Sequence, residues 1–381
     1  MFTPRFIQIH ALQNYTGTLL NRDDTGLAKT MPYGGVPRTR ISSQCLKRHW
    51  RKSEGEYALT GIAPDPVRTK ELADLAILKR VRELTPGLNE DLAMRALQAL
   101  NTGLYGDKGN DSNSRQPLLF GQNEIDYLSI KTSDILRDNS EPEQVAAAVN
   151  KLLEKKSEGD NFQAFRLSQS MPAGIIGAMF GRMMTSDPNA NIDAAVHVAH
   201  AFTTHGEEKE IDYFTAMEEL SPDPGAGHIG DTEINSGIYY VYVCVDVRGL
   251  TANTIGCPPE KWLDNNRDIA AEAVSKLVGL VATVSPGAKK GSTAPYGYAK
   301  ALLVEAGERQ PRSLSGAYRQ PSRPDFQDAV EHLNLEVESH DQVYGSHEAR
   351  KMFVNLGPEP DCTLKDITEW VSQVVLYGDA Q

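Results

Sequence analysis

Cysteine is scarce in this chain of 381 residues, and its four cysteines stand alone, with no Cys-x-x-Cys pair. That pattern argues against a disulfide framework or a zinc knuckle and favours reduced thiols. Long apolar runs are also missing: the candidates at 175–180 and 277–284 are far shorter than the roughly 20 residues that span a bilayer. The N-terminal segment lacks the pattern of a secretory signal. We therefore expect a soluble, cytoplasmic protein with no membrane partner.

An excess of basic residues is missing as well. The chain has 39 Lys and Arg against 51 Asp and Glu, a formal net charge of −12. Taken alone, this total argues against a nucleic-acid-binding protein. The distribution of charge reverses that argument, because residues 1–52 contain nine basic and two acidic residues. This segment carries +7, and the rest of the chain carries −19.

The basic segment contains a predicted helix that begins at Ser42, a residue type that caps helices well. Lys47 and Arg51 are one turn apart and project from one face, with Gln44 and Arg48 beside them. A helix that begins there also offers backbone N–H groups to an anion. This pattern suits a phosphate backbone, although a solvated basic face explains it equally well from the sequence alone.

Hydrophobic periodicity predicts a mixed order of elements. Strands are expected at 6–12, 193–202, 236–247 and 298–305, and helices at 42–52, 266–284, 325–340 and 363–376. The polar segment 20–40 is expected to form turns, and residues 66–165 a mostly helical insertion. Within it we expect helical segments at 67–100 and 141–156 and a glycine-rich loop at 103–123. This order predicts an α+β fold with a ferredoxin-like β-α-β-β-α-β core that carries insertions.

Two adjacent aromatic residues, Tyr213 and Phe214, lie in an acidic excursion bounded by Pro and Gly between two expected strands. An aromatic pair on a projecting hairpin can stack between nucleic-acid bases, which contributes roughly 1–3 kcal/mol per base. A local hydrophobic cluster that holds the excursion together is the favoured alternative from sequence alone.

Two glycine-rich strings resemble nucleotide-binding motifs only superficially. GAGHIG at 225–230 lacks a preceding strand and a following helix, and GAKKGST at 287–293 lacks the spacing of a P-loop. Neither predicts binding of a dinucleotide or ATP. Lys289 and Lys290 stand between glycines in the second string, where they can approach a nucleic-acid backbone closely.

Metal and cofactor sites are not predicted. His197, His200 and His205 invite a metal hypothesis, but strand geometry would separate the first two, and no supporting motif accompanies them. Asp23 and Asp24 are candidates for a metal or general-base site, although a structural turn is the favoured interpretation. We therefore expect no metal and no cofactor.

Longer strings carry a family resemblance. They are LNRDDTG, GG-x-x-R-x-R-I-S-S-Q-C-L-K-R-x-x-R, GRMMTS, the run from AHAFTTH through EIDYFTAMEEL and GAGHIG to SGIYY, and VSPGAKKGSTAPY. Their order and spacing over 5–54, 180–245 and 277–305 resemble the CasC-type backbone subunit of type I-E CRISPR Cascade complexes, in the Cas-seven family of the RAMP superfamily. The helical region 60–165 and the C-terminal tail do not match residue by residue.

The resemblance implies a modified RRM-like palm (1–59, 166–202 and 236–381), a helical finger insertion (60–165) and a β-hairpin thumb (203–235). It implies a non-catalytic subunit that polymerises along a CRISPR RNA and presents it in segments for pairing with target DNA in antiviral defence. The implied partners are the CRISPR RNA, target DNA, further copies of the chain head to tail, other Cascade subunits and a separately recruited nuclease-helicase.

The resemblance also implies roles for particular residues. The positions that hold the RNA backbone are Arg22, Lys29, Ser42, Gln44, Lys47, Arg48 and Arg51. Met183 would pack against the guide, and Tyr213 and Phe214 would interrupt the guide–target duplex, with Tyr213 standing where a Trp is usual. Lys151, Lys155 and Lys156, on an expected helix of the insertion, are hypothetical contacts to incoming DNA that no motif supports.

A competing hypothesis is a RAMP-type ribonuclease that cleaves bound RNA with Asp23 or Asp24. The loop fits a structural turn better, and the resemblance implies a separate nuclease. A metal enzyme that uses the three histidines is a third hypothesis.

Overall fold

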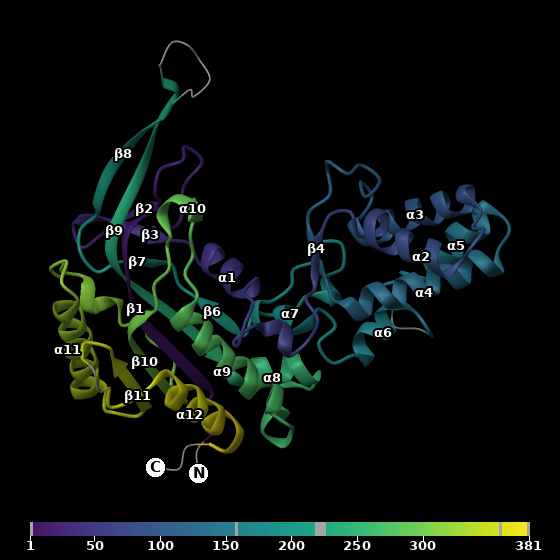
Figure 1. Cartoon of the computed structure of the whole chain (residues 1–381). Coiled ribbons are helices and arrows are strands. Elements are labelled where there is room, and N and C mark those ends of the chain that lie inside the picture. The colour runs from purple at the N-terminus through teal and green to yellow at the C-terminus, as the bar shows by residue number, and fades with distance from the viewer. Residues whose placement is uncertain (1–2, 157–158, 218–225, 358–359, 379–381) are drawn as a thin grey trace. The chain divides into compact units, whose positions relative to one another are not determined.

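The computed structural model describes residues 3–156, 159–217, 226–357 and 360–378. The chain divides into two compact units (Figure 1). Unit 1 comprises residues 1–58, 197–247 and 271–381, and unit 2 comprises residues 59–196 and 248–270. Residues 166–196, which the resemblance assigns to the palm, thus cluster with the helical unit.

Unit 1 is built on a large antiparallel sheet in the strand order β11-β10-β1-β9-β7-β3-β2. These strands are β1 (Phe6–Thr18), β2 (Thr30–Tyr33), β3 (Val36–Ile41), β7 (Ala201–Thr203), β9 (Ala226–Asp246), β10 (Ala299–Gly307) and β11 (Ala349–Val354). Two further strands, β6 (Val196–Val198) and β8 (Glu208–Met217), pair with β9. The helices of this unit are α1 (Ser43–Arg51), α9 (Asp268–Thr283), α10 (Lys290–Thr293), η5 (Ser315–Tyr318), α11 (Phe326–Tyr344) and α12 (Leu364–Tyr377).

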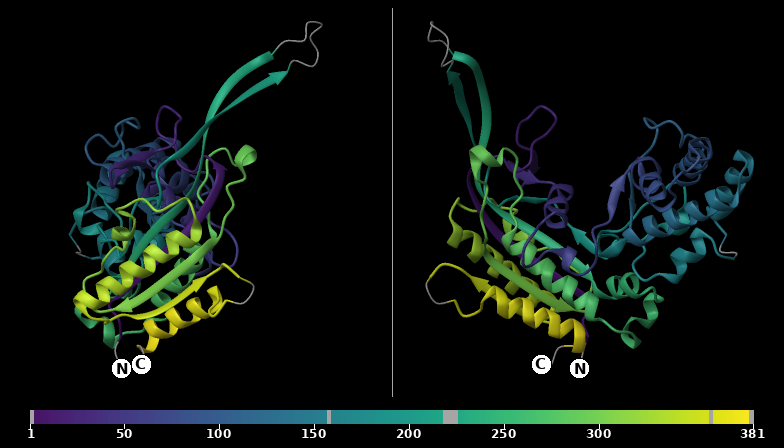
Figure 2. Two further views of the ribbon diagram at one scale, coloured as in Figure 1. Left: turned by 90° about the vertical axis from the view of Figure 1, so that its left-hand side faces the viewer. Right: turned by 45° about the vertical axis from the view of Figure 1, so that its right-hand side comes forward.

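Helices cover both faces of this sheet (Figure 2). Ile9 shares a face of β1 with Gln13, whose Nε2 donates to the carbonyl of Val281 in α9 at 2.7 Å. Leu12 points to the other face, where it joins a buried cluster with Leu333 of α11. Because side chains alternate along a strand, β1 supplies residues to the cores on both faces of the sheet. Its residues are therefore buried almost without interruption.

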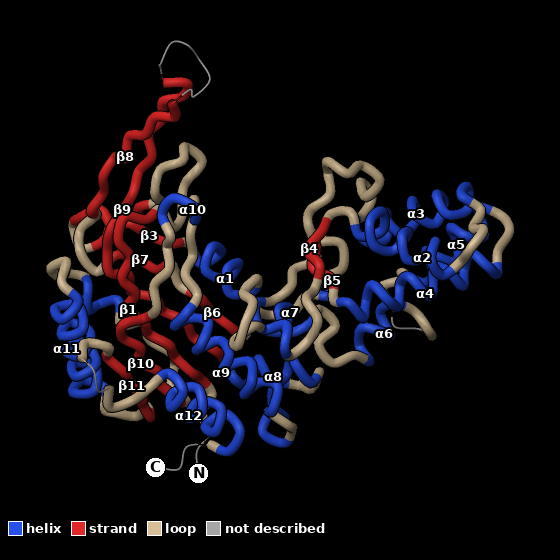
Figure 3. Tube along the Cα trace, in the orientation of Figure 1, coloured by secondary structure: helices blue, strands red, loops and turns tan. Residues whose placement is uncertain are grey.

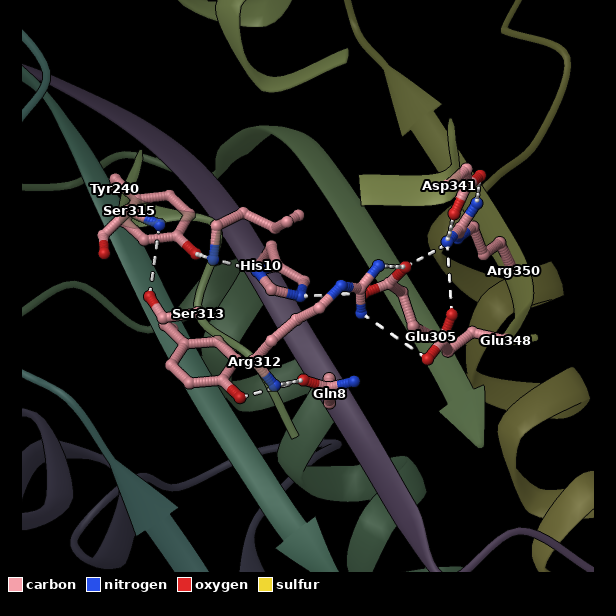
Figure 4. Close-up of polar contacts among 12 residues, drawn as sticks. Gln8, His10, Tyr240, Glu305, Arg312, Ser313, Ser315, Asp341, Glu348 and Arg350 are labelled. Carbon is pink, nitrogen blue, oxygen red and sulfur yellow. Dashed lines mark hydrogen bonds and ion pairs between the residues drawn. The ribbon is translucent and has the colours of Figure 1, made fainter. Parts of the chain in front are cut away.

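A polar network is buried on the α11 face of the sheet (Figure 4). The backbone N–H of Leu314 donates to the Tyr240 hydroxyl at 3.0 Å, and that hydroxyl lies 2.8 Å from Nδ1 of His10. On the other side of the ring, Nε2 of His10 lies 3.3 Å from Oε2 of Glu305. Burial lowers the pKa of His10, which keeps the ring neutral.

Glu305 is the fully buried carboxylate at the centre of this network. Arg312 donates to both its oxygens at 2.9 and 3.1 Å, and Nε of Arg350 donates to Oε1 at 2.6 Å. Burial raises the pKa of Glu305, but the hydrogen bond from His10 and the charge of Arg312 outweigh it and hold the pKa at about 2. The network therefore contains an ionised carboxylate at neutral pH.

Unit 2 is mostly helical and has its own apolar core, which includes Phe120, Leu128 and Val149. Its elements are η1 (Leu59–Gly61), β4 (Val67–Thr69), η2 (Ala73–Ile77), α2 (Leu78–Leu84), α3 (Glu90–Tyr105), β5 (Leu118–Phe120), α4 (Gln122–Asp138), α5 (Pro142–Leu152), α6 (Phe162–Ser168), α7 (Gly174–Phe180), η3 (Pro188–Ala190) and η4 (Pro259–Asp264). Helix α8 (Val247–Ile255) follows β9 directly. Glu124, fully buried on α4, accepts hydrogen bonds from Arg166 at 2.6 Å and from Arg182 at 2.8 Å.

The α+β class with a large antiparallel sheet is confirmed. The loop expected at 103–123 is present but shorter, at residues 106–117, because α3 continues to Tyr105, β5 (Leu118–Phe120) follows and α4 begins at Gln122. One of its glycines, Gly109, is packed closely against the backbone: a Cβ at this position would lie 2.0 Å from the carbonyl oxygen of Asn101. Glycine there reflects lack of space.

Other element boundaries also differ from expectation. The predicted turns at 20–40 contain the hairpin β2–β3, and β1 runs past Leu12 to Thr18. The strand predicted at 193–202 is two short strands. The helix predicted at 141–156 ends at Leu152.

The predicted helix at 67–100 opens with strand β4 and is interrupted between Leu84 and Glu90, where Pro86 and Gly87 stand. In the described part of the chain, no helix combines the length and apolar composition needed to cross a membrane.

The charge network around Glu305 yields a stability prediction. Glu305→Ala would leave Arg312 and Arg350 without their shared carboxylate, and breaking a buried pair in this way costs about 3–5 kcal/mol. We expect that loss in urea unfolding at pH 7. Because the folded pKa lies below the ordinary value of 4.5, the stabilisation is complete above pH 4.5 and disappears as the pH falls towards 2.

The matched control is Glu369→Ala, which removes an exposed partner of Lys365 on α12. Exposed ion pairs contribute little, so this variant should unfold almost like the wild type. Equal destabilisation by the two substitutions would contradict the role assigned to Glu305.

Candidate nucleic-acid interface

Helix α1 is anchored at its first residue and along one side. Oγ of Ser42 accepts a hydrogen bond from the backbone N–H of Cys45 at 3.3 Å, and the backbone N–H of Ser42 donates to Oδ1 of Asn21 at 2.9 Å. Leu46 and Trp50 are almost completely buried, as their spacing predicts. The helix is therefore fixed both to the core and to the loop that follows β1.

The predicted contact residues of α1 lie on the side away from Leu46. Gln44 and Arg48 are exposed, and Lys47 and Arg51 are half-buried. At 100° per residue these four positions occupy one sector of the helix. The sequence-predicted basic face is thus present on an anchored helix.

The loop between β1 and β2 is a closed turn. Oδ1 of Asp23 accepts hydrogen bonds from the N–H and the hydroxyl of Thr25 at 2.9 and 2.7 Å, and from the N–H of Leu27 at 3.1 Å. These bonds, the one from the Thr25 side chain foremost, lower the pKa of Asp23. Arg22 is exposed in this turn, and Lys29 at its end is half-buried. The geometry favours the structural turn over a catalytic aspartate.

The loop before β10 carries Lys289 and Lys290, both exposed. It is closed where Oγ of Ser285 donates to the carbonyl of Gly297 at 2.8 Å. Lys289 has φ +49° and Ala294 φ +39°, the left-handed region that side chains rarely adopt. Such strain persists only where the surrounding structure holds it in place, and it is common at binding sites.

This loop contacts two neighbouring elements. The N–H of Ala288 donates to the carbonyl of Leu19 at 2.8 Å, next to the turn that follows β1. The ammonium of Lys289 donates to the hydroxyl of Thr232 in β9 and lies 5.8 Å from the ring centroid of Phe214 in β8. Loops that are distant in the sequence therefore meet at one end of the sheet.

The pKa values of two histidines reveal the concentration of positive charge. Burial lowers the pKa of His200, and the charges of Arg40, Lys29 and Lys47 lower it further. Burial also lowers the pKa of His49, and so do the charges of Lys290 and Arg48. These cations lie on α1, at the end of β3 and in the two loops, and we call them, together with Arg22, Arg51 and Lys289 on the same elements, the basic surface. Its members are Arg22, Lys29, Arg40, Lys47, Arg48, Arg51, Lys289 and Lys290.

Sequence reasoning missed three residues of this region: Arg40, His49 and His200. Arg40 belongs to the R-x-R string, but nothing local distinguishes it from Arg38, which is fully buried and donates to three backbone carbonyls. His200 comes from a distant segment, and its Nδ1 accepts from the N–H of Ser43 at 3.2 Å.

His205, grouped with His200 in the sequence, is buried and structural. Its Nε2 accepts from the N–H of Ile238 at 3.2 Å, and Nδ1 lies 2.7 Å from the carbonyl of Gly206. Among the described residues, no group of three or more His, Cys, Asp and Glu side chains is arranged to hold a metal ion.

The aromatic residues of the excursion lie on the hairpin β8–β9, which extends beyond the rest of the sheet (Figure 3). Tyr213 pairs with Asp231 and Phe214 with Gly230, so the two rings point to opposite faces of the ribbon. A Cβ at Gly230 would lie 2.6 Å from the ring of Phe214, which therefore covers that glycine. Tyr213 is 65% exposed and Phe214 40%. Residues 218–225, including the first residue of GAGHIG, lie outside the described residues.

Four predicted contact residues belong to unit 2. Met183 is 75% exposed, although Arg182 and Met184 on either side of it are buried. Lys151 is exposed on α5. Lys155 and Lys156 are exposed beyond the end of that helix, contrary to the prediction that all three lysines lie on it.

Comparison with known proteins gives a consistent result. A family model described as CT1975-like protein matches residues 7–372. A solved chain of a CRISPR RNA-guided surveillance complex, pre-nicking, is similar with a TM-score of 0.76 and 27% identity, over 97% of this chain and 100% of that chain. A chain of another CRISPR RNA-guided surveillance complex has a TM-score of 0.65 at 24% identity, over 96% and 99% of the two chains, and supports the fold alone. No curated protein sequence matches.

Proposed function

The chain belongs to the CT1975-like protein family, and from that premise we propose that it is a non-catalytic backbone subunit that binds CRISPR RNA in a surveillance complex. The observation that carries the proposal is the basic surface, which an otherwise acidic chain concentrates on one anchored helix, the end of β3 and two hydrogen-bonded loops. Such a surface suits a polyanion whose backbone, rather than its sequence, is recognised.

Guide–target pairing supplies the sequence specificity in such a complex, so the protein needs phosphate contacts and the correct shape. We propose that the basic surface, with Ser42 and Gln44 beside it, holds the RNA backbone. The rigid support of α1 favours this role, because residues that are already ordered lose little conformational entropy when RNA binds. Met183 would pack against the guide as an exposed apolar side chain on a fixed backbone.

The finer assignment is also a proposal. The strings in the sequence favour the type I-E class, with copies stacked head to tail and with other subunits, target DNA and a recruited nuclease-helicase as partners. The order β10-β1-β9-β7 is the order that a ferredoxin-like core has, which supports an RRM-like palm with the hairpin β8–β9 as thumb. A non-catalytic role is supported by Asp23, whose carboxylate is engaged in its own turn.

Reversing two charges on α1 tests the RNA site. We expect a small RNA to copurify with the wild-type protein, and Lys47→Glu with Arg51→Glu should abolish its retention, because the phosphates then meet two anions. The control reverses Lys351 and Lys365, on β11 and α12, and changes the net charge equally. RNA content is read from the absorbance ratio and a denaturing gel, and circular dichroism checks the fold. Full RNA retention by the Lys47/Arg51 variant would refute the site.

The hairpin has its own test. A thumb that interrupts the guide–target duplex should leave regularly spaced unpaired nucleotides, which chemical probing detects as reactive positions. Tyr213→Ala with Phe214→Ala should remove this periodic reactivity and leave retention of the guide intact. Each lost stack is worth roughly 1–3 kcal/mol. Ile211→Ala, an exposed apolar residue on the same strand, is the matched control. Unchanged periodic reactivity in the double variant would exclude the wedge role.

We further propose that Lys151, Lys155 and Lys156 contact incoming DNA, which their exposure supports. Reversing all three to Glu should weaken capture of duplex DNA by the assembled complex and spare guide binding. The control reverses three other exposed lysines of unit 2, Lys79, Lys108 and Lys261. Binding of duplex DNA is measured by gel shift. Equal DNA binding by the two triple variants would exclude a specific contact of Lys151, Lys155 and Lys156 with DNA.

A further inference from the structure

Two exposed tyrosines stand in the segment that joins α10 to β10 (Figure 1). Tyr296 is 73% exposed and Tyr298 is 72% exposed, whereas Pro295 and Ala299 beside them are buried. Exposure therefore alternates along the chain, as it does where successive side chains of an extended segment point to opposite sides. The two tyrosines are two residues apart, so both rings are presented to solvent on the same side of the segment.

The backbone that carries the two rings is held in place at Gly297, the residue between them. The N–H of Gly297 donates to Oγ of Ser285 at 2.9 Å, and Oγ of Ser285 donates to the carbonyl of Gly297 at 2.8 Å. A Cβ at Gly297 would lie 2.9 Å from the carbonyl oxygen of Asn14, so the segment packs directly against β1. Rings on a backbone that is already ordered lose little conformational entropy when a ligand binds.

The same segment packs against the part of the loop that carries Lys289 and Lys290. A Cβ at Gly287 would lie 2.3 Å from Cγ of Pro295, so a side chain at position 287 would collide with this proline. The N–H of Ala294 also donates to the carbonyl of Lys290 at 3.0 Å. The two tyrosines are therefore carried by the same folded loop as two lysines of the basic surface.

The charge around the tyrosines indicates the kind of ligand that they suit. Residues 285–300 contain three lysines and no acidic residue: Lys289 and Lys290 precede the tyrosines, and Lys300, which is also exposed, follows them. Proteins bind single-stranded nucleic acid with this combination, because bases stack on the aromatic rings while the backbone follows the cations. A protein surface that covered the rings would have to desolvate these ammonium groups, whereas RNA supplies phosphates for them.

We propose that Tyr296 and Tyr298 form a stacking platform for unpaired bases of a bound single-stranded RNA. A ring can stack on any base, so the platform adds affinity without reading the sequence. It differs from the hairpin residues Tyr213 and Phe214, whose proposed role concerns the guide–target duplex, because it acts on the RNA before any target pairs. This inference rests on the proposed RNA-binding function and adds contacts to bases to the proposed contacts with the backbone.

The test measures binding of a fluorescent single-stranded RNA oligonucleotide to the full chain by anisotropy at several salt concentrations. Tyr296→Ala with Tyr298→Ala should weaken binding at least about tenfold. The dependence of affinity on salt should not change, because no phosphate contact is lost. Replacing both tyrosines with Phe keeps the rings and should preserve the affinity. The matched control is Tyr344→Ala with Tyr377→Ala, which removes two similarly exposed tyrosines from α11 and α12 and should bind like the wild type.

An abasic oligonucleotide of the same length separates stacking from other effects. It keeps the phosphates but has no bases, so the wild type and the double Ala variant at 296 and 298 should bind it equally.

Four outcomes would overturn the inference: wild-type RNA affinity in the double Ala variant, a double Phe variant as weak as the double Ala variant, a lower salt dependence in the double Ala variant, or an equal loss of affinity for the abasic oligonucleotide. If the double Ala variant keeps its RNA affinity but no longer associates with other copies of the chain in gel filtration, the rings contact protein and the inference is wrong. If the wild type binds neither oligonucleotide, the proposed function itself fails.

Discussion

The pairing of β1 with two antiparallel neighbours is the constraint on which the rest of unit 1 depends. Thr18 near its end pairs with Asn235 of β9, and Gln13 pairs with Ala299 at the start of β10. Because the neighbours run opposite to β1, the exit of β1, the entry of β10 and the base of the hairpin must lie at the same end of the sheet. The basic surface is therefore assembled by topology from segments more than two hundred residues apart.

Local sequence patterns allowed part of the basic surface to be predicted. The spacing of Leu46 and Trp50 and the cap at Ser42 define α1 and its basic face without any distant contact. The alternation of side chains along a strand would also have placed Tyr213 and Phe214 on opposite faces of the hairpin. The contribution of Arg40 was not predictable in this way, because its environment depends on His200 and on the register between β3 and β7. The close packing of Gly109 was not predicted, because composition cannot distinguish a flexible glycine from one that lacks room for a Cβ.

Net charge was a poor guide because cations differ in what surrounds them. Arg312 and Arg350 are held by Glu305, and Arg166 and Arg182 by Glu124, so these charges are committed to the interior of their own units. Around α1, by contrast, the positive charges of Lys290 and Arg48 lower the pKa of His49, and those of Arg40, Lys29 and Lys47 lower the pKa of His200. An acidic chain can thus present a positive surface, because most of its carboxylates lie elsewhere or stabilise buried arginines.

The left-handed residues in the loop before β10 carry a consequence for protein engineering. A side chain in that conformation costs roughly 1–2 kcal/mol that glycine would avoid. Ala294 has no charged group that its strained conformation could position. The strained conformation of Lys289, by contrast, accompanies the contacts of its ammonium with Phe214 and Thr232. Substitutions selected for heat resistance would therefore favour glycine at both positions, yet only the one at 294 would leave the electrostatic surface intact. Stability and surface charge can therefore be changed separately at position 294, whereas at position 289 a gain in one costs the other.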